Sequence, residues 1–507
     1  MGPLSRTAHV VRQPYDPHMP GPPQSEPAAQ PPSPRRQRVV LAVCCMSLLI
    51  VSLDNTALNV ALPSLQRELH ASVSGLQWTI DAYTLVLASL LMLSGSTADR
   101  IGRRKVFVTG LVLFVVGSLL CSLAPSLEAL VAFRMVQAVG GSMLNPVAMS
   151  IITNTFTEPA ARARAIGAWG AVVGVSMATG PLVGGLLVQS VGWRAIFWVN
   201  LPIGLAALLL TFRYVPESRA PRPRRPDPVG QVLVTVLLGS LTYAIIETSA
   251  PFAGLAGLAL VGLLLYEPRR REPLIDLRFF RSAPFSGATV IAVCAFSALG
   301  AFLFQNTLYL QDVRGLSALH AGLFMLPMAA MTFVFAPLSG RLVGARGPRP
   351  SLVLAGAAMA AGALLFAAFH AETSTPMLFT GYVVFGIGFG LVNAPITNTA
   401  VSGMPRAQAG VAAAVASTSR QIGQTLGVAV AGAVLTTGLA SATTYSMEGF
   451  VEASKPVYWI VTGCGLAVLL AGALTSGAWA RGTAERTARR LEAECGGAHA
   501  TARASSA

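Results

Sequence analysis

Long apolar segments follow one another through almost the whole chain and leave little room for a water-soluble fold. Of the 507 residues, 53% are hydrophobic and only 11% are charged, and the mean hydropathy is +0.61. A soluble domain carries about a quarter charged residues, so a deficit spread over this length indicates that lipid surrounds most of the chain. The apolar segments have the length of membrane-spanning helices. The sequence therefore predicts an all-α, polytopic membrane protein.

Fourteen segments are long enough to cross a membrane as helices. They cover residues 39–62, 78–98, 106–124, 127–152, 166–188, 195–213, 229–247, 251–267, 284–310, 319–342, 350–369, 375–400, 409–436 and 456–480. If the chain starts in the cytoplasm, most of the 36 basic residues fall on that side, as the positive-inside rule requires. The sequence thus predicts a multi-pass protein of the cytoplasmic membrane with both termini in the cytoplasm.

A weak internal repeat divides the chain into two halves. Glycine-led basic loops follow the second and the tenth segment, at residues 95–105 and 340–349, and repeated halves are typical of transporters. We therefore expect two six-helix bundles with the seventh and eighth segments inserted between them. The predicted parts are a disordered cytoplasmic tail (1–37), an N-terminal bundle (38–213), two inserted helices (229–267), a C-terminal bundle (284–480) and a second cytoplasmic tail (481–507).

Asp54 and Arg134 are ionisable residues inside predicted spans, where a charge without a cavity or a partner is costly. Asp54 lies about 15 residues into the first span and Arg134 about seven residues into the antiparallel fourth span, so both sit at a similar depth. An arginine nearby favours the carboxylate, whereas burial favours the acid. This balance is what a proton-coupling site requires. The alternative interpretation is a static buried ion pair.

The loop at residues 95–105 has the glycines of a tight turn and carries five charges within seven residues. A charged loop of this kind commonly serves only to anchor the topology. Asp99 among basic residues suggests instead a latch that meets a helix amino terminus or a basic group of the other half. The candidate latch residues are Gly95, Asp99, Arg100, Gly102, Arg103 and Arg104.

Small residues line the fifth span and predict close packing against another helix. A kink at Gly180 and Pro181 that serves alternating access is the functional interpretation of the same stretch. The residues concerned are Gly170, Gly174, Gly180, Pro181, Gly184 and Gly185.

Further polar residues inside or near spans are candidates for contact with a substrate. Interhelical hydrogen bonds explain Asn306, Asn393 and Arg420 equally well. Asp81 sits at the outer end of its predicted span, where it either meets a cationic substrate or is solvated.

The sequence contains no pattern typical of catalysis, of a cofactor or of a metal site. Neither of its two lysines follows a glycine, as a P-loop would require, and no His-Glu-x-x-His or Gly-x-Ser-x-Gly occurs. The arginines lie in short clusters between apolar runs, which argues against nucleic-acid binding. We therefore expect no enzyme, no cofactor and no bound metal.

Taken together, these segments resemble the major facilitator superfamily, and within it the fourteen-helix drug:proton antiporters, from about residue 39 to residue 480. Six stretches are similar to motifs of that family in the same order: residues 53–63, 95–105, 134–141, 170–185, 193–202 and 420–427. The resemblance implies two six-helix bundles plus two extra helices around a central cavity. It also implies rocker-switch alternating access and export driven by proton influx, with Arg134 tied to proton coupling.

Residues 78–83 add a hint about the substrate. This stretch, which contains Asp81 and Tyr83, is similar to a version found in exporters of cationic antiseptics and of antibiotics in their producers. Tyr83 therefore joins the candidate substrate contacts. The fifth-span glycine motif separates exporters from sugar importers in the superfamily, so the resemblance favours export.

The resulting hypothesis is a monomeric drug:proton antiporter that exchanges protons for small amphipathic or cationic drug-like molecules across the lipid bilayer. Asp54 is its protonation site and Arg134 the modulator of that site. One alternative is a proton-coupled exporter of an endogenous metabolite such as an amino acid or a siderophore. A second alternative is a polytopic membrane enzyme, whose cluster of His, Ser/Asp or Glu residues at the membrane interface the sequence does not contain.

Overall fold

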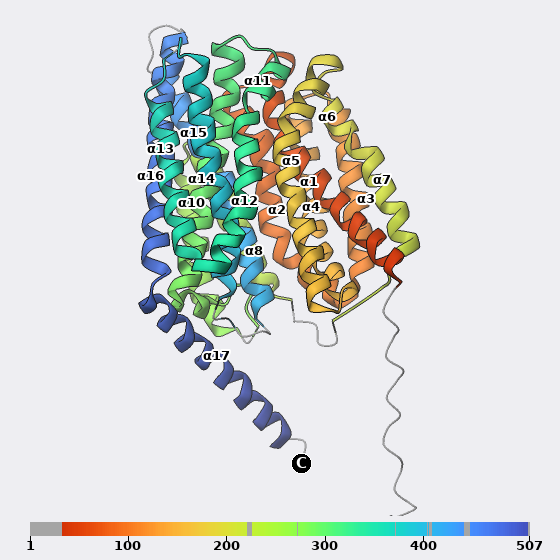
Figure 1. The fold of residues 1–507 in the computed structure, drawn as a ribbon. Coiled ribbons are helices and arrows are strands. Elements are labelled where there is room, and N and C mark those ends of the chain that lie inside the picture. The colour runs from red at the N-terminus through yellow and green to blue at the C-terminus, as the bar shows by residue number, and fades with distance from the viewer. Residues whose placement is uncertain are drawn as a thin grey trace, which may run out of the picture.

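The computed structural model describes residues 33–220, 226–270, 272–370, 372–402, 404, 408–440 and 447–504. Within these ranges the chain forms helices and no strand (Figure 1). The elements are α1 (Pro34–Leu69), α2 (Val73–Ile101), α3 (Arg103–Ser122), α4 (Leu127–Thr155), α5 (Pro159–Ser190), α6 (Ala195–Trp198), α7 (Asn200–Tyr214), α8 (Pro228–Ile246), α9 (Ala250–Tyr266), η1 (Glu267–Arg269), η2 (Leu277–Arg281), α10 (Ala283–Leu308), η3 (Tyr309–Val313), α11 (Ala318–Phe324), α12 (Leu326–Arg346), α13 (Pro348–Ala367), α14 (Thr375–Val401), α15 (Ala409–Ala440), α16 (Met447–Thr475) and α17 (Ala478–Ala504).

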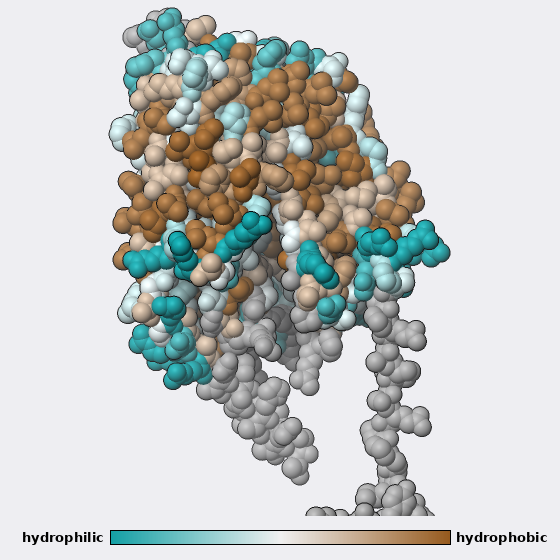
Figure 2. All heavy atoms as spheres, in the orientation of Figure 1, coloured by the Kyte–Doolittle hydropathy of each residue, from teal (hydrophilic) through white to brown (hydrophobic). Residues whose placement is uncertain are grey.

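Fourteen helical stretches of the described residues are long and apolar enough to cross a membrane, which confirms the number expected from the sequence. Figure 2 shows a broad hydrophobic belt around the bundle, with polar residues gathered at both ends. Large apolar side chains in this belt face outward, and Leu258 and Leu474 are 72% and 68% exposed. An apolar surface of this extent marks contact with a membrane. The fold is therefore that of an all-α, polytopic membrane protein.

Three boundaries differ from the sequence-based expectation. The sixth span, expected as one helix over 195–213, is broken at Val199 into α6 and α7. The tail expected to be disordered over 1–37 is helical from Pro34, because Ser33 caps α1 and proline is favourable in a first helical turn; residues 1–32 lie outside the described part. The expected second tail over 481–507 holds helix α17.

The membrane helices form two bundles joined by an inserted hairpin. In the first bundle α1 packs against α5 and α7, and α3 packs against α4. In the second, α10 packs against α15 and α13 packs against α16. The hairpin consists of α8 and α9, and α8 contacts α2 of the first bundle and α15 of the second. This is the expected architecture of two six-helix bundles plus two extra helices.

The two bundles touch at the end that lies opposite the start of α1 and the helix α17 (Figure 1). Near the beginning of α2, the Gln77 amide donates hydrogen bonds to the backbone carbonyls of Val428 and Ala429, at 3.2 and 2.7 Å. In η3, directly after α10, Gln311 Nε2 donates to the Val60 carbonyl of α1 at 2.8 Å. These contacts close the bundle at that end.

Candidate functional site

Asp54 lies at the centre of the first bundle, where its carboxylate accepts hydrogen bonds from three other side chains. Its Oδ2 forms an ion pair with Arg134 of α4. Its Oδ1 accepts from Gln137 Nε2 and from Asn200 Nδ2, both at 2.9 Å. Gln137 and Asn200 also donate to Ser118 Oγ of α3, at 2.8 and 3.3 Å. These five polar residues, none of them exposed to solvent, are called the Asp54 cluster below.

Arg134 is held by more than its ion pair. Its Nε donates to the Thr79 carbonyl of α2 at 3.2 Å, and its Nη1 also donates to Gln137 Oε1 at 2.7 Å. Its guanidinium carbon lies 4.1 Å from the centre of the Tyr83 ring, a cation–π contact that gains strength away from water. The sequence-based expectation that Asp54 and Arg134 meet in the membrane thus agrees with the geometry.

The chemistry open to the Asp54 cluster is proton binding. With Asp54 ionised, its carboxylate accepts three hydrogen bonds and balances the charge of Arg134. A proton on Asp54 would remove the ion pair and leave a buried guanidinium without its counter-charge. Protonation of Asp54 would thus remove one of the contacts that join α1 to α4. Arg134 Nη2 and Tyr83 Oη have no hydrogen-bond partner among the described residues, so polar atoms remain for a rearranged cluster.

Sequence reasoning assigned no role to three members of the cluster. Gln137 lies three residues after Arg134 on α4, a spacing that places both side chains on one face of a helix. Asn200 opens α7 directly after the break at Val199. A glutamine one helical turn from an arginine inside a span could have identified Gln137 as a member of the site. Nothing in the sequence distinguishes Ser118 of α3 from the other serines inside spans.

The candidate latch residues bind within their own bundle in this conformation. Gly102 ends α2 with φ at 125°, a backbone region that favours glycine. Asp99 forms its ion pair with Arg103, at 2.8 Å. The first turn of α3 binds the segment that follows α7. The Arg103 N–H donates to the Ser218 carbonyl at 2.9 Å, and the Arg104 N–H donates to Glu217 Oε1 at 3.1 Å.

Other latch residues take different positions in the same loop. The Arg104 side chain donates to the Phe212 carbonyl at 2.6 Å. Arg100 is exposed at the end of α2, and a Cβ on Gly95 would lie 3.6 Å from Pro146 of α4. The contact of Glu217 with this loop was not expected from the sequence. A contact of Asp99 with the second bundle stays a prediction for another conformation.

The glycines of α5 divide into a packed group and an open group. A Cβ on Gly180 would lie 2.0 Å from Thr56 Oγ1, and one on Gly184 would lie 2.8 Å from the Ala57 carbonyl oxygen, both on α1. A Cβ on Gly185 would lie 2.6 Å from the Ala318 carbonyl of α11, across the two bundles. By contrast, Gly170 has open space and Gly174 meets only Phe333, at 3.4 Å.

The packed glycines therefore bring α5 close to α1 and to the second bundle. The neighbouring Pro181 takes part in the same contact, because its carbonyl oxygen lies 2.3 Å from the position of a Cβ on Gly322 of α11. α5 continues through Pro181 as one helix from Pro159 to Ser190. Close packing thus explains this half of the motif.

We expect Gly184→Ala to destabilise the protein by about 1–3 kcal/mol, because the new methyl group meets backbone atoms of α1 that cannot turn away. The matched change Gly170→Ala, on the same helix, should be neutral or stabilising by up to about 1 kcal/mol, because alanine is the better helix former. Thermal unfolding of the two purified variants in detergent tests this contrast. Equal melting temperatures would contradict the packing role of Gly184.

The remaining candidate substrate contacts lie in different surroundings. Asp81 is fully buried and neither carboxylate oxygen has a hydrogen-bond partner among the described residues, so the solvated interpretation is wrong. Asn306 is buried, and Tyr382 donates to its Oδ1 at 2.9 Å. Asn393 and Arg420 are half-buried, and Arg420 donates to Thr397 Oγ1. Within the described residues no group of three or more His, Cys, Asp or Glu side chains could hold a metal ion.

Two bundles of membrane helices with an ion pair buried inside one of them are typical of a membrane transporter. The profile of the Major Facilitator Superfamily matches residues 44–428, and the chain belongs to this superfamily. It is therefore a transporter and not an enzyme.

Curated relatives cover most of the chain. The "Multidrug resistance protein Stp" of Mycobacterium tuberculosis (strain CDC 1551 / Oshkosh) is 37% identical over 431 residues, which are 83% of this chain and 79% of that protein. The "Tetracenomycin C resistance and export protein" of Streptomyces glaucescens is 37% identical over 78% of this chain and 75% of that protein. The "Methylenomycin A resistance protein" of Streptomyces coelicolor (strain ATCC BAA-471 / A3(2) / M145) is 35% identical over 78% and 85%.

Solved structures agree on the fold. A bacterial homologue of the human lysosomal transporter Spinster has a TM-score of 0.60 and 19% identity, covering 90% of this chain and 99% of its own. The human organic anion transporter MFSD10 has a TM-score of 0.61 and 17% identity, covering 87% of this chain and 100% of its own.

Proposed function

We propose that this transporter exports drug-like molecules across the cytoplasmic membrane in exchange for protons. The observation that carries the proposal is the Asp54 cluster, a carboxylate buried in the membrane beside an arginine and two amides. An ionisable residue at this depth marks a proton or substrate pathway by default. Relatives whose names state multidrug resistance or antibiotic export support drugs as the cargo.

The transport cycle we propose links the charge of Asp54 to the orientation of the two bundles. In the described conformation the bundles are joined through Gln77 and Gln311 at the end opposite the termini. With both termini in the cytoplasm, as the distribution of basic residues favours, that end faces outward, and the path for the substrate opens toward the cytoplasm. Proton binding to Asp54 from outside and its release inside then accompany the alternation. The loop at Asp99 and Arg103 latches the opposite state.

Half-buried polar residues between the bundles are the substrate contacts in this proposal. Asn393 and Arg420 of the second bundle are half-buried and carry hydrogen-bonding groups. Asp81, buried here, becomes available to a cationic group when the outer end opens. Small amphipathic or cationic molecules fit this combination. The protein works as a monomer in this scheme, because one chain supplies both bundles.

Transport by everted membrane vesicles from a pump-deficient host tests the function. With an acidic interior, vesicles that carry the protein should accumulate a fluorescent cationic drug, and a protonophore should release it. Vesicles from the same host without the gene should accumulate none. A susceptibility panel in that host should show raised inhibitory concentrations for at least one drug class. Protection against nothing would instead favour an exporter of an endogenous metabolite.

A further inference from the structure

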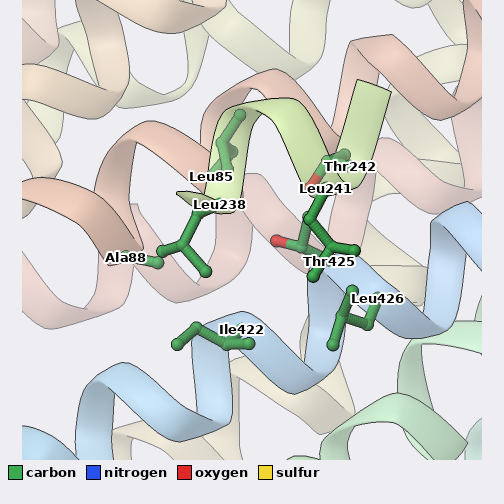
Figure 3. Close-up of a pocket in the computed structure, with 8 residues that line it drawn as sticks. All are labelled: Leu85, Ala88, Leu238, Leu241, Thr242, Ile422, Thr425 and Leu426. Carbon is green, nitrogen blue, oxygen red and sulfur yellow. The ribbon is translucent and has the colours of Figure 1, made fainter. Parts of the chain in front are cut away.

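The inserted hairpin α8–α9 lies beside the contact between α2 of the first bundle and α15 of the second, which is called the seam below. Leu238 of α8 shares a small apolar pocket with Leu85 and Ala88 of α2 and with Ile422 of α15 (Figure 3). Gln231 of α8 donates through Nε2 to the Ser89 carbonyl of α2 at 2.6 Å. The position of α8 is therefore tied to both bundles, and any group that holds the hairpin together also acts on this seam.

Two carboxylates meet at the base of the hairpin. Asp227 precedes α8 and Glu267 follows α9, and they are only 5% and 1% exposed. Asp227 Oδ1 accepts from the Gly230 N–H at 3.0 Å and from the Tyr266 hydroxyl at 3.1 Å. Asp227 Oδ2 and both oxygens of Glu267 make no hydrogen bond to the described residues. Buried carboxylate oxygens without partners call for a ligand, since such atoms are costly to leave unsatisfied.

Gly230 shows that the unsatisfied oxygens point into one small space. A Cβ built on Gly230 would lie 2.7 Å from Glu267 Oε1 and 2.8 Å from Asp227 Oδ2. The two carboxylates therefore point toward the same position next to Gly230. Because glycine has no side chain, no Cβ occupies that position. We call Asp227 and Glu267 the hairpin carboxylate pair.

Among the described residues, one positive charge is found within ion-pair distance of the two carboxylates. Arg270 Nε lies 3.9 Å from Asp227 Oδ1, and its side chain is 41% exposed. The backbone N–H groups of Leu274 and Ile275 lie close enough to Glu267 to favour its charged form, although they do not reach hydrogen-bond geometry. The Tyr266 ring adds no charge.

The segment with Leu274 and Ile275 packs against α8 and carries Glu272, Asp276 and Arg278, of which Arg278 pairs with Asp276 at 2.7 Å. The charged groups of the other helices that pack against α8 are Asp81, Asp99 and Arg100 on α2 and Arg420 on α15. Asp99 pairs with Arg103 and Arg420 donates to Thr397, whereas Arg100 is exposed at the end of α2.

We propose that the hairpin carboxylate pair is a proton-binding site that holds one proton between Asp227 and Glu267. Two carboxylates this close cannot both stay ionised away from water, and sharing one proton removes their repulsion. When the pair holds the proton, Arg270 balances its one remaining negative charge. When the proton is lost, the two negative charges at the start of α8 and the end of α9 repel each other. The packing of α8 against α2 and α15 then weakens. The site shares no residue with the Asp54 cluster.

Infrared difference spectroscopy between acidic and alkaline pH detects the proton directly. The wild-type protein should show the carbonyl band of a protonated carboxylic acid that is missing in both Glu267→Gln and Asp227→Asn, because Arg270 balances the single carboxylate that remains. The double variant should remove no more of the band than either single variant. The band should persist in Asp54→Asn and in Glu485→Gln, an exposed carboxylate on α17. If the band is unchanged in both single variants, the proposal is wrong. It is also wrong if the double variant loses twice the band intensity that a single variant loses.

Thermal unfolding across the same pH range gives an independent readout that does not depend on transport. As pH rises and the shared proton is lost, the melting temperature of the wild type should fall by a few degrees relative to Glu267→Gln, while Glu485→Gln follows the wild type. A constant difference between wild type and Glu267→Gln at all pH values contradicts a proton site. If Mg²⁺ or Ca²⁺ raises the melting temperature of the wild type and not of Glu267→Gln, the ligand is a metal ion and the proton assignment is wrong.

Discussion

Replacing Asp54 by asparagine is expected to reduce pH-gradient-driven drug accumulation in everted vesicles to the level of vesicles without the protein. Asparagine keeps the size and the hydrogen-bonding capacity of a protonated aspartic acid but cannot release a proton. Gln137 and Asn200 can still bond to its side-chain oxygen after small rotations of their amides. The variant should therefore retain gradient-free exchange of labelled for unlabelled drug, a step that needs alternation without a change in protonation.

Glu485→Gln is a control for this experiment. Glu485 is exposed on α17, so loss of its charge should leave accumulation intact. Expression levels and melting temperatures of both variants separate a transport defect from a folding defect. Undiminished uphill efflux in Asp54→Asn would remove Asp54 from the mechanism. The fold and the family of the protein would be unaffected by that outcome.

The sequence predicts the membrane fold well because the physics behind it is local. A helix that crosses lipid needs a long apolar run, and each of the fourteen runs can be recognised by itself. The break at Val199 shows the limit of this approach. Hydropathy does not distinguish a straight helix over 195–213 from two helices that place Asn200 against Asp54.

The depth of the candidate site in the membrane could be predicted from the sequence, but not all of the residues that form it. A rise of about 1.5 Å per residue fixes how far Asp54 and Arg134 lie from the membrane surfaces, and a buried charge needs a partner. Which face each helix turns toward its neighbours depends on packing between distant segments. For that reason Ser118, and the contact of Glu217 with the loop at Gly102, appear only in three dimensions.

The same reasoning applies to the inserted hairpin. Asp227 and Glu267 are 40 residues apart in the numbering, and each lies at the edge of an apolar run, where a charged residue normally reaches water. Only the antiparallel pairing of α8 with α9 and the small size of Gly230 bring the two carboxylates together. Asp81 likewise sits in the first third of its helix but is fully buried, which hydropathy does not predict.

Arg134→Ala is expected to destabilise the protein by about 3–5 kcal/mol, because it leaves the Asp54 carboxylate buried without a counter-charge. The loss should shrink as pH falls, since an uncompensated buried carboxylate takes up a proton and the folded variant then binds more protons than the unfolded chain. Arg134→Lys should lie between wild type and alanine. Lysine restores the charge but not the planar group that bonds to the Thr79 carbonyl and stacks on Tyr83.

The double variant Asp54→Asn/Arg134→Ala decides whether the two residues act as one unit. Removing both charges leaves no isolated ion in the bundle, so the double variant should be more stable than the sum of the single losses predicts, by about 0.5–3 kcal/mol. Thermal unfolding of the four proteins at one neutral pH measures this coupling. Strict additivity would mean that Arg134 stabilises α2 and α4 through Thr79 and Tyr83 alone. The ion pair would then be too weak to transmit a change in the protonation of Asp54 to the packing of the helices.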